Sequence, residues 1–143
     1  MADRTANIVW TGALLDGGGT IESVGSGAFG PLDVTWTSRA EESEGRTSPE
    51  ELIAAAHAAC FSMALSHGLA QAGTPAERLE TSATVTFVPG TGITRVALVV
   101  RGSVPGLDEA AFLEQAEAAR DGCPVSKALA GVPEIALDAR LAY

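Results

Sequence analysis

The stretch from Ser48 to Gln71 predicts one long helix that is apolar on almost every side. Ser48 is a good N-cap residue, a proline follows it at the first helical position, and Glu51 can complete a capping box. Strong helix formers continue to Gln71, after which Gly73 and a second proline end the segment. The helix is about 23 residues long, or ~35 Å at 1.5 Å per residue. A helix that is apolar nearly all round is buried on most sides, often by a second subunit as well as by its own sheet.

The rest of the chain indicates short strands, one hairpin and two further helices. Period-two alternation and clusters of turn residues predict strands over residues 5–10, 20–24, 31–37, 79–88, 93–100 and 135–141. Helical patterns cover residues 107–121 and 124–129. Strands and helices do not alternate strictly, which predicts an α+β fold with a largely antiparallel sheet. The length of 143 residues predicts a single domain over residues 1–143.

The composition argues against several classes of partner. The net charge of −9 and the pI of about 4.5 disfavour nucleic acid, because an acidic surface repels phosphate. No apolar run approaches the ~18 residues of a membrane span, so we expect no membrane association. Residues 1–7 have no apolar core or cleavage pattern, so we expect no secretion signal. These features predict a cytoplasmic protein, whose thiols stay reduced.

The chain has two cysteines, each in a setting that suits redox chemistry. Cys60 lies within the long apolar helix, where packing explains a small buried thiol as well as reactivity does. Cys123 precedes Pro124 and is expected at the N-cap of a short helix, where the helix dipole and free N–H groups favour thiolate. Serine would cap that turn better, so the thiol indicates a function. The two cysteines are candidates for a working redox pair.

An ion pair is expected where the long helix begins. Arg39 and Arg46 flank an acidic loop before the helix, and most arginines in such places are solvated. An arginine here can instead pair with Glu50 in the first turn of the helix. A carboxylate fixes a guanidinium through two hydrogen bonds and aims it at a neighbouring group.

Metal and cofactor sites are not expected. His57 and Cys60 are three residues apart on one helix face, but a zinc site needs three or four ligands. Only His67 and Cys123 are available to add to them. A histidine such as His57 on an apolar face is usually a packed core residue, although it is also a candidate cation beside the thiol. No flavin, haem or nucleotide motif is present.

These motifs resemble the OsmC branch of the OsmC/Ohr family. Residues 48–66, with their proline, paired glutamates, histidine and cysteine, resemble the central motif of that branch. Residues 122–126 (Gly-Cys-Pro-Val-Ser) resemble the second cysteine motif, and residues 104–108 and 135–138 are also similar. The resemblance covers nearly the whole chain. Two positions depart from it: Ser48 stands where asparagine is frequent, and Ala40 where an aromatic residue is common, which loosens the expected pocket wall.

The resemblance implies a fold, an activity and a set of site residues. The family folds as an intertwined homodimer of α+β subunits, each with a long central helix on a curved, largely antiparallel sheet. Its members are thiol peroxidases that reduce organic hydroperoxides and, less well, hydrogen peroxide. By resemblance Cys60 is the peroxidatic cysteine, Cys123 is the resolving cysteine, and Arg39 and Glu50 form the active-site ion pair. The implied reductant is a lipoyl-type dithiol, and no cofactor is implied.

Helix geometry adds an expectation about the dimer. Glu50 and Cys60 are ten residues apart on one helix, or ~15 Å along its axis. Arg39 paired with Glu50 would therefore struggle to reach Cys60 of its own chain. If two long helices pack antiparallel across a two-fold axis, Arg39 and Glu50 serve the partner subunit's Cys60, giving two composite sites.

Other functions remain open at this point. One alternative is a redox-sensing or thiol-binding protein that forms the disulfide without efficient turnover. Another is a hydrolase that uses Cys60 as a nucleophile and His57 as its base, although no orienting partner or oxyanion hole is evident. Alanines near Cys60, together with Phe61, Met63 and Leu52, suggest an apolar pocket suited to alkyl or fatty-acid hydroperoxides.

Overall fold

The computed structural model describes residues 1–142, which form two compact units. The N-terminal unit comprises residues 1–52 and the C-terminal unit comprises residues 53–142. Each unit is described by itself.

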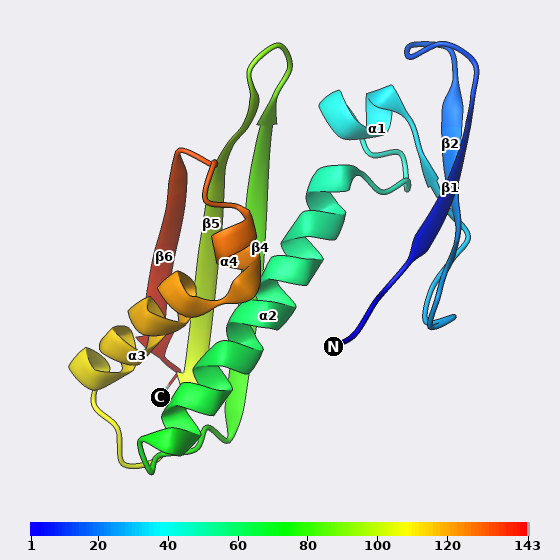
Figure 1. Ribbon diagram of the computed structural model, residues 1–143. Helices are drawn as coiled ribbons and strands as arrows, with labels where there is room; N and C mark the ends of the chain where they lie inside the picture. The colour runs from blue at the N-terminus through cyan, green and yellow to red at the C-terminus, as the bar shows by residue number, and fades with distance from the viewer. Residues whose placement is uncertain (143) are drawn as a thin grey trace. The chain divides into compact units, whose positions relative to one another are not determined.

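The N-terminal unit contains a small antiparallel sheet with the strand order β1-β2-β3, of which Figure 1 labels β1 and β2. Its strands are β1 (Ala6–Thr11), β2 (Gly18–Val24) and β3 (Leu32–Val34). All six residues of β1 are exposed, whereas β2 buries Gly19 and Ile21. The sheet therefore has one poorly covered edge strand.

A short helix, α1 (Trp36–Ala40), replaces the end of the strand predicted over residues 31–37. Thr35 caps this helix: its hydroxyl accepts from the Ser38 N–H at 3.0 Å, and the Ser38 hydroxyl accepts from the Thr35 N–H at 2.9 Å. The alternation in the sequence suggested a strand, but these reciprocal bonds favour a helical turn. Arg39 consequently lies in the last turn of α1 and not at a strand end.

The long helix α2 (Pro49–Gln71) has the predicted limits. The Ser48 hydroxyl accepts from the Glu51 N–H at 3.1 Å, which is the predicted N-cap. The Glu51 carboxylate accepts from the Thr47 hydroxyl at 2.9 Å, one residue before the position that a capping box would use. At the other end Gly73 has a φ of +85°, and the Thr74 N–H returns to the Leu69 carbonyl at 3.0 Å, which is the usual glycine-terminated helix end.

The C-terminal unit contains a second sheet with the strand order β4-β5-β6. The strands β4 (Arg78–Val88) and β5 (Gly92–Ser103) form the predicted antiparallel hairpin, and β6 (Glu134–Leu141) pairs with β5 in parallel. This parallel pairing is the exception in a largely antiparallel fold. It arises because α3 (Glu109–Gly122) and α4 (Pro124–Ala128) form the crossover that returns the chain to the same end of the sheet.

The core of the C-terminal unit lies between this sheet and the helices on one of its faces (Figure 1). The helix α2 contributes Phe61, Leu65 and Leu69, all 0% exposed. They pack with residues from β5, α3 and β6, namely Leu98, Val100, Phe112, Ala116, Ala119 and Ala139. The predicted α+β architecture with a long central helix is therefore present.

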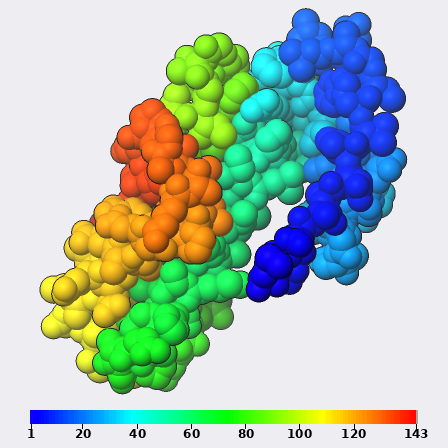
Figure 2. Space-filling view, in the orientation of Figure 1, coloured from blue at the N-terminus to red at the C-terminus, as the bar shows by residue number. Residues whose placement is uncertain are grey.

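The opposite face of α2 is open in the single chain. By length and composition α2 is apolar enough to cross a membrane, with a mean hydropathy of 1.4, and only 22% of that window is buried. Core helices of soluble proteins have the same length and composition. The C-terminal part of α2 (green) reaches the surface in Figure 2. The exposed side chains on α2 are mostly small or apolar and include Ala55, Ala56, Ala59, Met63, Ser66 and Ala70.

Candidate functional site

The structure brings the two cysteines together. Cys60 lies in the middle of α2, and Cys123 lies between α3 and α4. Their sulfur atoms share a hydrogen bond at 2.9 Å, and both thiols are free. A disulfide bond is about 2.05 Å long, so a small movement of either side chain would close it.

The two thiols differ in access. Cys123 is 0% exposed, whereas Cys60 is partly exposed. A molecule arriving from solvent therefore reaches the sulfur of Cys60 first. Cys123 is placed to react with whatever forms on Cys60.

The turn between α3 and α4 fixes Cys123. Its N–H donates to the Ala119 carbonyl at 2.9 Å, which ends α3, and its carbonyl accepts from the Lys127 N–H at 3.0 Å, which begins α4. Pro124 occupies the first position of α4, where its missing N–H costs nothing. The predicted N-cap position of Cys123 is confirmed.

The surroundings shift the pKa values of the two thiols in opposite directions. Burial is the largest effect on Cys60 and raises its pKa, and the neighbouring Cys123 thiol raises it further. Burial also acts to raise the pKa of Cys123, but hydrogen bonds from Cys60, Ser126 and the Val125 N–H outweigh it and lower the pKa. These contacts do not form a regular side-chain cap on α4, in keeping with the weak acceptor strength of sulfur. No cation is among the groups of the C-terminal unit that act on Cys60.

The predicted ion pair between Arg39 and Glu50 is present within the N-terminal unit. Arg39 Nε donates to Glu50 Oε1 at 3.0 Å and to Oε2 at 3.2 Å, and Nη2 donates to Oε1 at 2.8 Å. The Glu50 side chain is 7% exposed and that of Arg39 is 33% exposed. A buried carboxylate thus holds a guanidinium that still reaches the surface. Arg46 instead pairs with Glu44 in an exposed position.

Two residues that the sequence analysis missed position this ion pair. The Ser38 hydroxyl donates to the Thr47 carbonyl at 2.9 Å, and the Thr47 N–H donates to the Asp33 carbonyl at 3.1 Å. These bonds tie α1 and β3 to the residue before the N-cap of α2. Arg39 and Glu50 face each other because their two helices are joined there. The signal in the sequence was the Thr35–Ser38 cap, which has serine where the usual pattern has glutamate or glutamine.

His57 is a buried core residue and is not a partner of Cys60. It is 0% exposed, and its Nε2 atom lies 2.7 Å from the Ser126 hydroxyl oxygen. Burial lowers the pKa of His57 and favours the neutral ring. A neutral ring cannot supply the cation for a Cys60 thiolate. Across residues 1–142, three or more potential metal ligands do not gather at any point.

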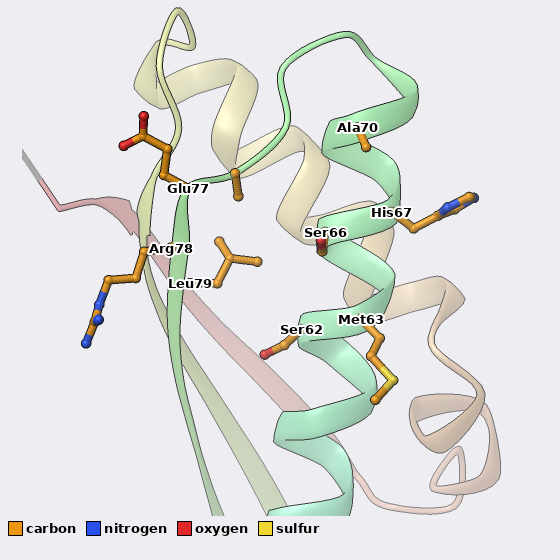
Figure 3. Close-up of a pocket in the computed structure, with 9 residues that line it drawn as sticks. Ser62, Met63, Ser66, His67, Ala70, Glu77, Arg78 and Leu79 are labelled. Carbon is orange, nitrogen blue, oxygen red and sulfur yellow. The ribbon is translucent and has the colours of Figure 1, made fainter.

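A groove on the surface of the C-terminal unit lies away from the two cysteines. It has a volume of about 560 Å³ and lies between α2 and the start of β4. Ser62 and Leu79 turn into it, whereas Arg78 turns away (Figure 3). The suggestion that Phe61 lines an apolar substrate pocket is wrong, because Phe61 is 0% exposed and packs in the core. Met63, which was also suggested to line that pocket, is 73% exposed in the single chain.

Comparisons with known proteins decide the family. A model of the family described as OsmC-like protein matches residues 41–138. The chain belongs to the OsmC family. Peroxiredoxin OsmC of Escherichia coli (strain K12) is 42% identical over 135 residues, which cover 92% of each chain. Peroxiredoxin OsmC of Shigella flexneri shows the same identity and coverage.

Solved structures of OsmC-like proteins share the fold. The organic hydroperoxide resistance protein OsmC of Legionella pneumophila has a TM-score of 0.70 and 25% identity, covering 95% of this chain and 96% of that one. The organic hydroperoxide resistance protein OhrB of Bacillus subtilis has a TM-score of 0.64 and 28% identity, covering 96% and 97%. The resemblance seen in the two cysteine motifs is thereby confirmed.

Proposed function

We propose that this OsmC-family protein is a cysteine-based peroxidase that reduces organic hydroperoxides and, less well, hydrogen peroxide. The observation that carries the proposal is the pair of free sulfur atoms 2.9 Å apart, one partly exposed and one buried. The names of the related proteins, peroxiredoxin and organic hydroperoxide resistance protein, support the same activity.

The first step takes place at Cys60. Its thiolate attacks the outer oxygen of the hydroperoxide, the O–O bond breaks, and the alcohol leaves after taking a proton. Cys60 becomes a sulfenic acid. Its partial exposure lets the peroxide reach the sulfur.

The second step uses Cys123. The Cys123 thiolate attacks the sulfenic sulfur, the S–O bond breaks, and hydroxide leaves and becomes water after protonation. The product is a Cys60–Cys123 disulfide. A dithiol of the lipoyl type then reopens it by thiol–disulfide exchange. The short distance between the two sulfur atoms supports this step.

Arg39 supplies the positive charge that the first step needs. Burial raises the pKa of Cys60, so a nearby cation is required to hold the thiolate at neutral pH. A guanidinium also stabilises the charge that develops on the leaving oxygen. Glu50 fixes Arg39 through three hydrogen bonds, and we assign the pair to the partner subunit's Cys60.

The assembly is proposed as a homodimer. The helix α2 exposes Met63 and a series of alanines although its sequence is apolar nearly all round. The N-terminal hairpin also exposes Ile8, Val9 and Trp10, at 57%, 49% and 40%. Apolar surface of this kind is typical of a face that another chain covers. A second copy laid along α2 would bury it.

Substrate preference and location follow from the same features. The exposed apolar side chains of α2 favour an alkyl or fatty-acid hydroperoxide over a small polar one. The paired free thiols and the charge of −9 suit a cytoplasmic protein that binds neither nucleic acid nor membrane.

Steady-state turnover tests the proposal. With cumene hydroperoxide and dihydrolipoamide, we expect catalytic consumption of peroxide by the wild-type protein. The Cys60→Ser variant should lose it entirely, and Cys123→Ser should complete one oxidation and then stall. Disulfide formation without turnover would instead indicate a redox sensor. Cleavage of a p-nitrophenyl ester with no peroxidase activity would indicate a hydrolase.

A further inference from the structure

A buried hydrogen bond that the proposed mechanism does not use joins α2 to α4. His57 on α2 is 0% exposed, Ser126 on α4 is 7% exposed, and His57 Nε2 lies 2.7 Å from Ser126 Oγ. The His57 ring makes this one hydrogen bond within residues 1–142, because its buried Nδ1 atom has no partner there. Without Ser126 the ring would be buried with neither nitrogen paired, which is costly in a folded protein.

Each end of this bond lies three residues from a cysteine. His57 precedes Cys60 by three positions on α2, and residues at that spacing lie on one face of a helix. Cys123 is the N-cap of α4 and Ser126 is the third residue of that helix, two positions that adjoin each other at a helix start. The helix α2 and the start of α4 are thus joined at two points, by the sulfur pair at 2.9 Å and by the His57–Ser126 bond.

The apolar core of the C-terminal unit does not include α4. Among the described residues, the core takes side chains from α2, α3 and the sheet and none from α4. Ser126 is the buried residue of this five-residue helix. Figure 1 shows α4 (orange) beside the middle of α2. The bond from Ser126 to His57 therefore fixes the short helix that begins after Cys123 to the helix that carries Cys60.

We propose that His57 and Ser126 are positioning residues that form a clamp between α2 and α4, and that this clamp keeps Cys123 in place to form a disulfide with Cys60. The sulfur atoms must close from 2.9 Å to about 2.05 Å. Two thiols that are already held in place lose little conformational freedom when the bond forms, which raises the effective concentration of one at the other. This inference rests on the proposed peroxidase function, whose second step it concerns.

The step that the clamp assists balances with the peroxide as the oxidant. Cys60 sulfenic acid reacts with Cys123: an S–S bond forms, the S–O bond breaks, and the departing hydroxide leaves as water with the proton of the Cys123 thiol. The Cys123 sulfur is oxidised and the sulfenic sulfur is reduced. His57 and Ser126 exchange no proton or electron in this step, so their effect is on the positions of the two sulfur atoms.

The thiol–disulfide equilibrium tests the clamp without any peroxide. The folded protein is equilibrated with mixtures of oxidised and reduced dithiothreitol, and the fraction of disulfide is measured by alkylation and mass spectrometry. We expect Ser126→Ala to lower the effective concentration of the two thiols about tenfold, or about 30 mV for this two-electron couple, which is the effect expected from one buried hydrogen bond. His57→Leu should lower it by a similar factor. Ser126→Thr keeps the hydroxyl and should restore most of the loss.

A matched control and a double variant separate positioning from stability. Ser62 Oγ donates to Thr81 Oγ1 at 2.7 Å, which joins the same helix to β4 instead of α4. Ser62→Ala removes a similar hydrogen bond and should leave the equilibrium unchanged. Combining His57→Leu with Ser126→Ala should lower the effective concentration no further than either change alone, because each change already breaks the bond.

Trapping of the sulfenic acid tests the same step during the reaction. One equivalent of cumene hydroperoxide is added to the reduced protein together with dimedone, which labels sulfenic acid. We expect Ser126→Ala to give about fivefold to tenfold more labelled Cys60 than the wild type, because a lower effective concentration slows disulfide formation. The rate of peroxide loss in the first turnover should not change. Ser62→Ala should behave as the wild type.

The outcomes separate this inference from the proposed function. The clamp would be overturned if Ser126→Ala and Ser62→Ala had the same equilibrium, or if the losses multiplied in the double variant. Lower resistance to urea with a wild-type equilibrium would also overturn it, because the pair would then serve the fold alone. Ser126→Ala decides the question if His57→Leu does not fold. Failure of the wild-type protein to consume peroxide would refute the peroxidase function, and the dithiothreitol equilibrium would still decide the clamp.

Discussion

At the scale of single residues, the buried carboxylate of Glu50 imposes the strictest requirement. Its side chain is 7% exposed and accepts three hydrogen bonds from Arg39. A buried charge without its partner is strongly unfavourable. The ion pair is therefore needed for the fold of the N-terminal unit as well as for the chemistry proposed for it.

The Arg39→Met variant tests this requirement. Because Arg39 is one-third exposed, solvent weakens the penalty, and we expect the free energy of unfolding to fall by about 2–3 kcal/mol. Urea denaturation measures it. Arg46→Met is the matched control: its pair with Glu44 is exposed, so the loss should stay below about 1 kcal/mol. Equal losses in the two variants would show that the buried pair does not stabilise the fold.

Residue types and local spacing predicted several site contacts, and distant contacts were not predictable. The cap signals around Ser48 and Cys123 and the carboxylate of Glu50 are local, so the sequence revealed them. The bond from His57 to Ser126 joins residues 69 positions apart and depends on how α4 packs against α2. The residues next to His57 and Ser126 in the sequence do not indicate that contact.

At the scale of secondary-structure elements, close packing between β5 and α3 explains a glycine within a strand. A Cβ built on Gly102 would lie 2.6 Å from Cζ and 2.7 Å from Cε1 of Phe112, which is fully buried. The ring occupies the space that a side chain would need. Such close approach of a neighbouring group is a common reason for glycine inside a strand.

The Gly102→Ala variant is therefore expected to destabilise the protein. Displacing the buried Phe112 ring should cost about 1–3 kcal/mol, as overpacking of a core usually does. Chemical denaturation gives the value. Gly131→Ala is the control, because a Cβ there meets nothing within 4 Å. A Gly102→Ala variant as stable as Gly131→Ala would disprove the tight contact.

The long helix α2 and the short helix α4 were predicted closely, whereas the short helix α1 was missed. The helix α2 has strong signals at both ends, so its limits were recovered. The helix α1 was missed because Trp36 continues a period-two pattern that is typical of a strand. The Thr35–Ser38 cap forms two hydrogen bonds in the structure, but its sequence has serine where a capping box usually has glutamate or glutamine. The parallel pairing of β6 with β5 was not predicted, because pairing direction depends on the path of the crossover and not on the strand's own residues.

At the scale of the whole molecule, the proposed composite site predicts that two inactive variants can complement each other. A mixed dimer of Cys60→Ser and Arg39→Met has one site that combines an intact Cys60 with an intact Arg39. Random exchange of subunits makes about half of the dimers mixed, so about a quarter of the wild-type rate should return. The mixture is assayed with cumene hydroperoxide and dihydrolipoamide.

A second mixture controls for this result. Cys60 and Cys123 lie 2.9 Å apart within one chain, so mixing Cys60→Ser with Cys123→Ser should restore no turnover. If the Arg39 mixture is no more active than its parents, each chain uses its own arginine or none. Recovery in both mixtures would indicate that the sulfur pair also crosses between subunits.

The central claim is that one organic hydroperoxide oxidises the two thiols of a single chain to a disulfide. The most direct measurement is the intact mass of the reduced protein after one equivalent of cumene hydroperoxide. We predict a loss of two hydrogens, about 2 Da, with peptide mapping that places the new bond between Cys60 and Cys123. An unchanged mass, or a bond that joins other sulfur atoms, would contradict the account.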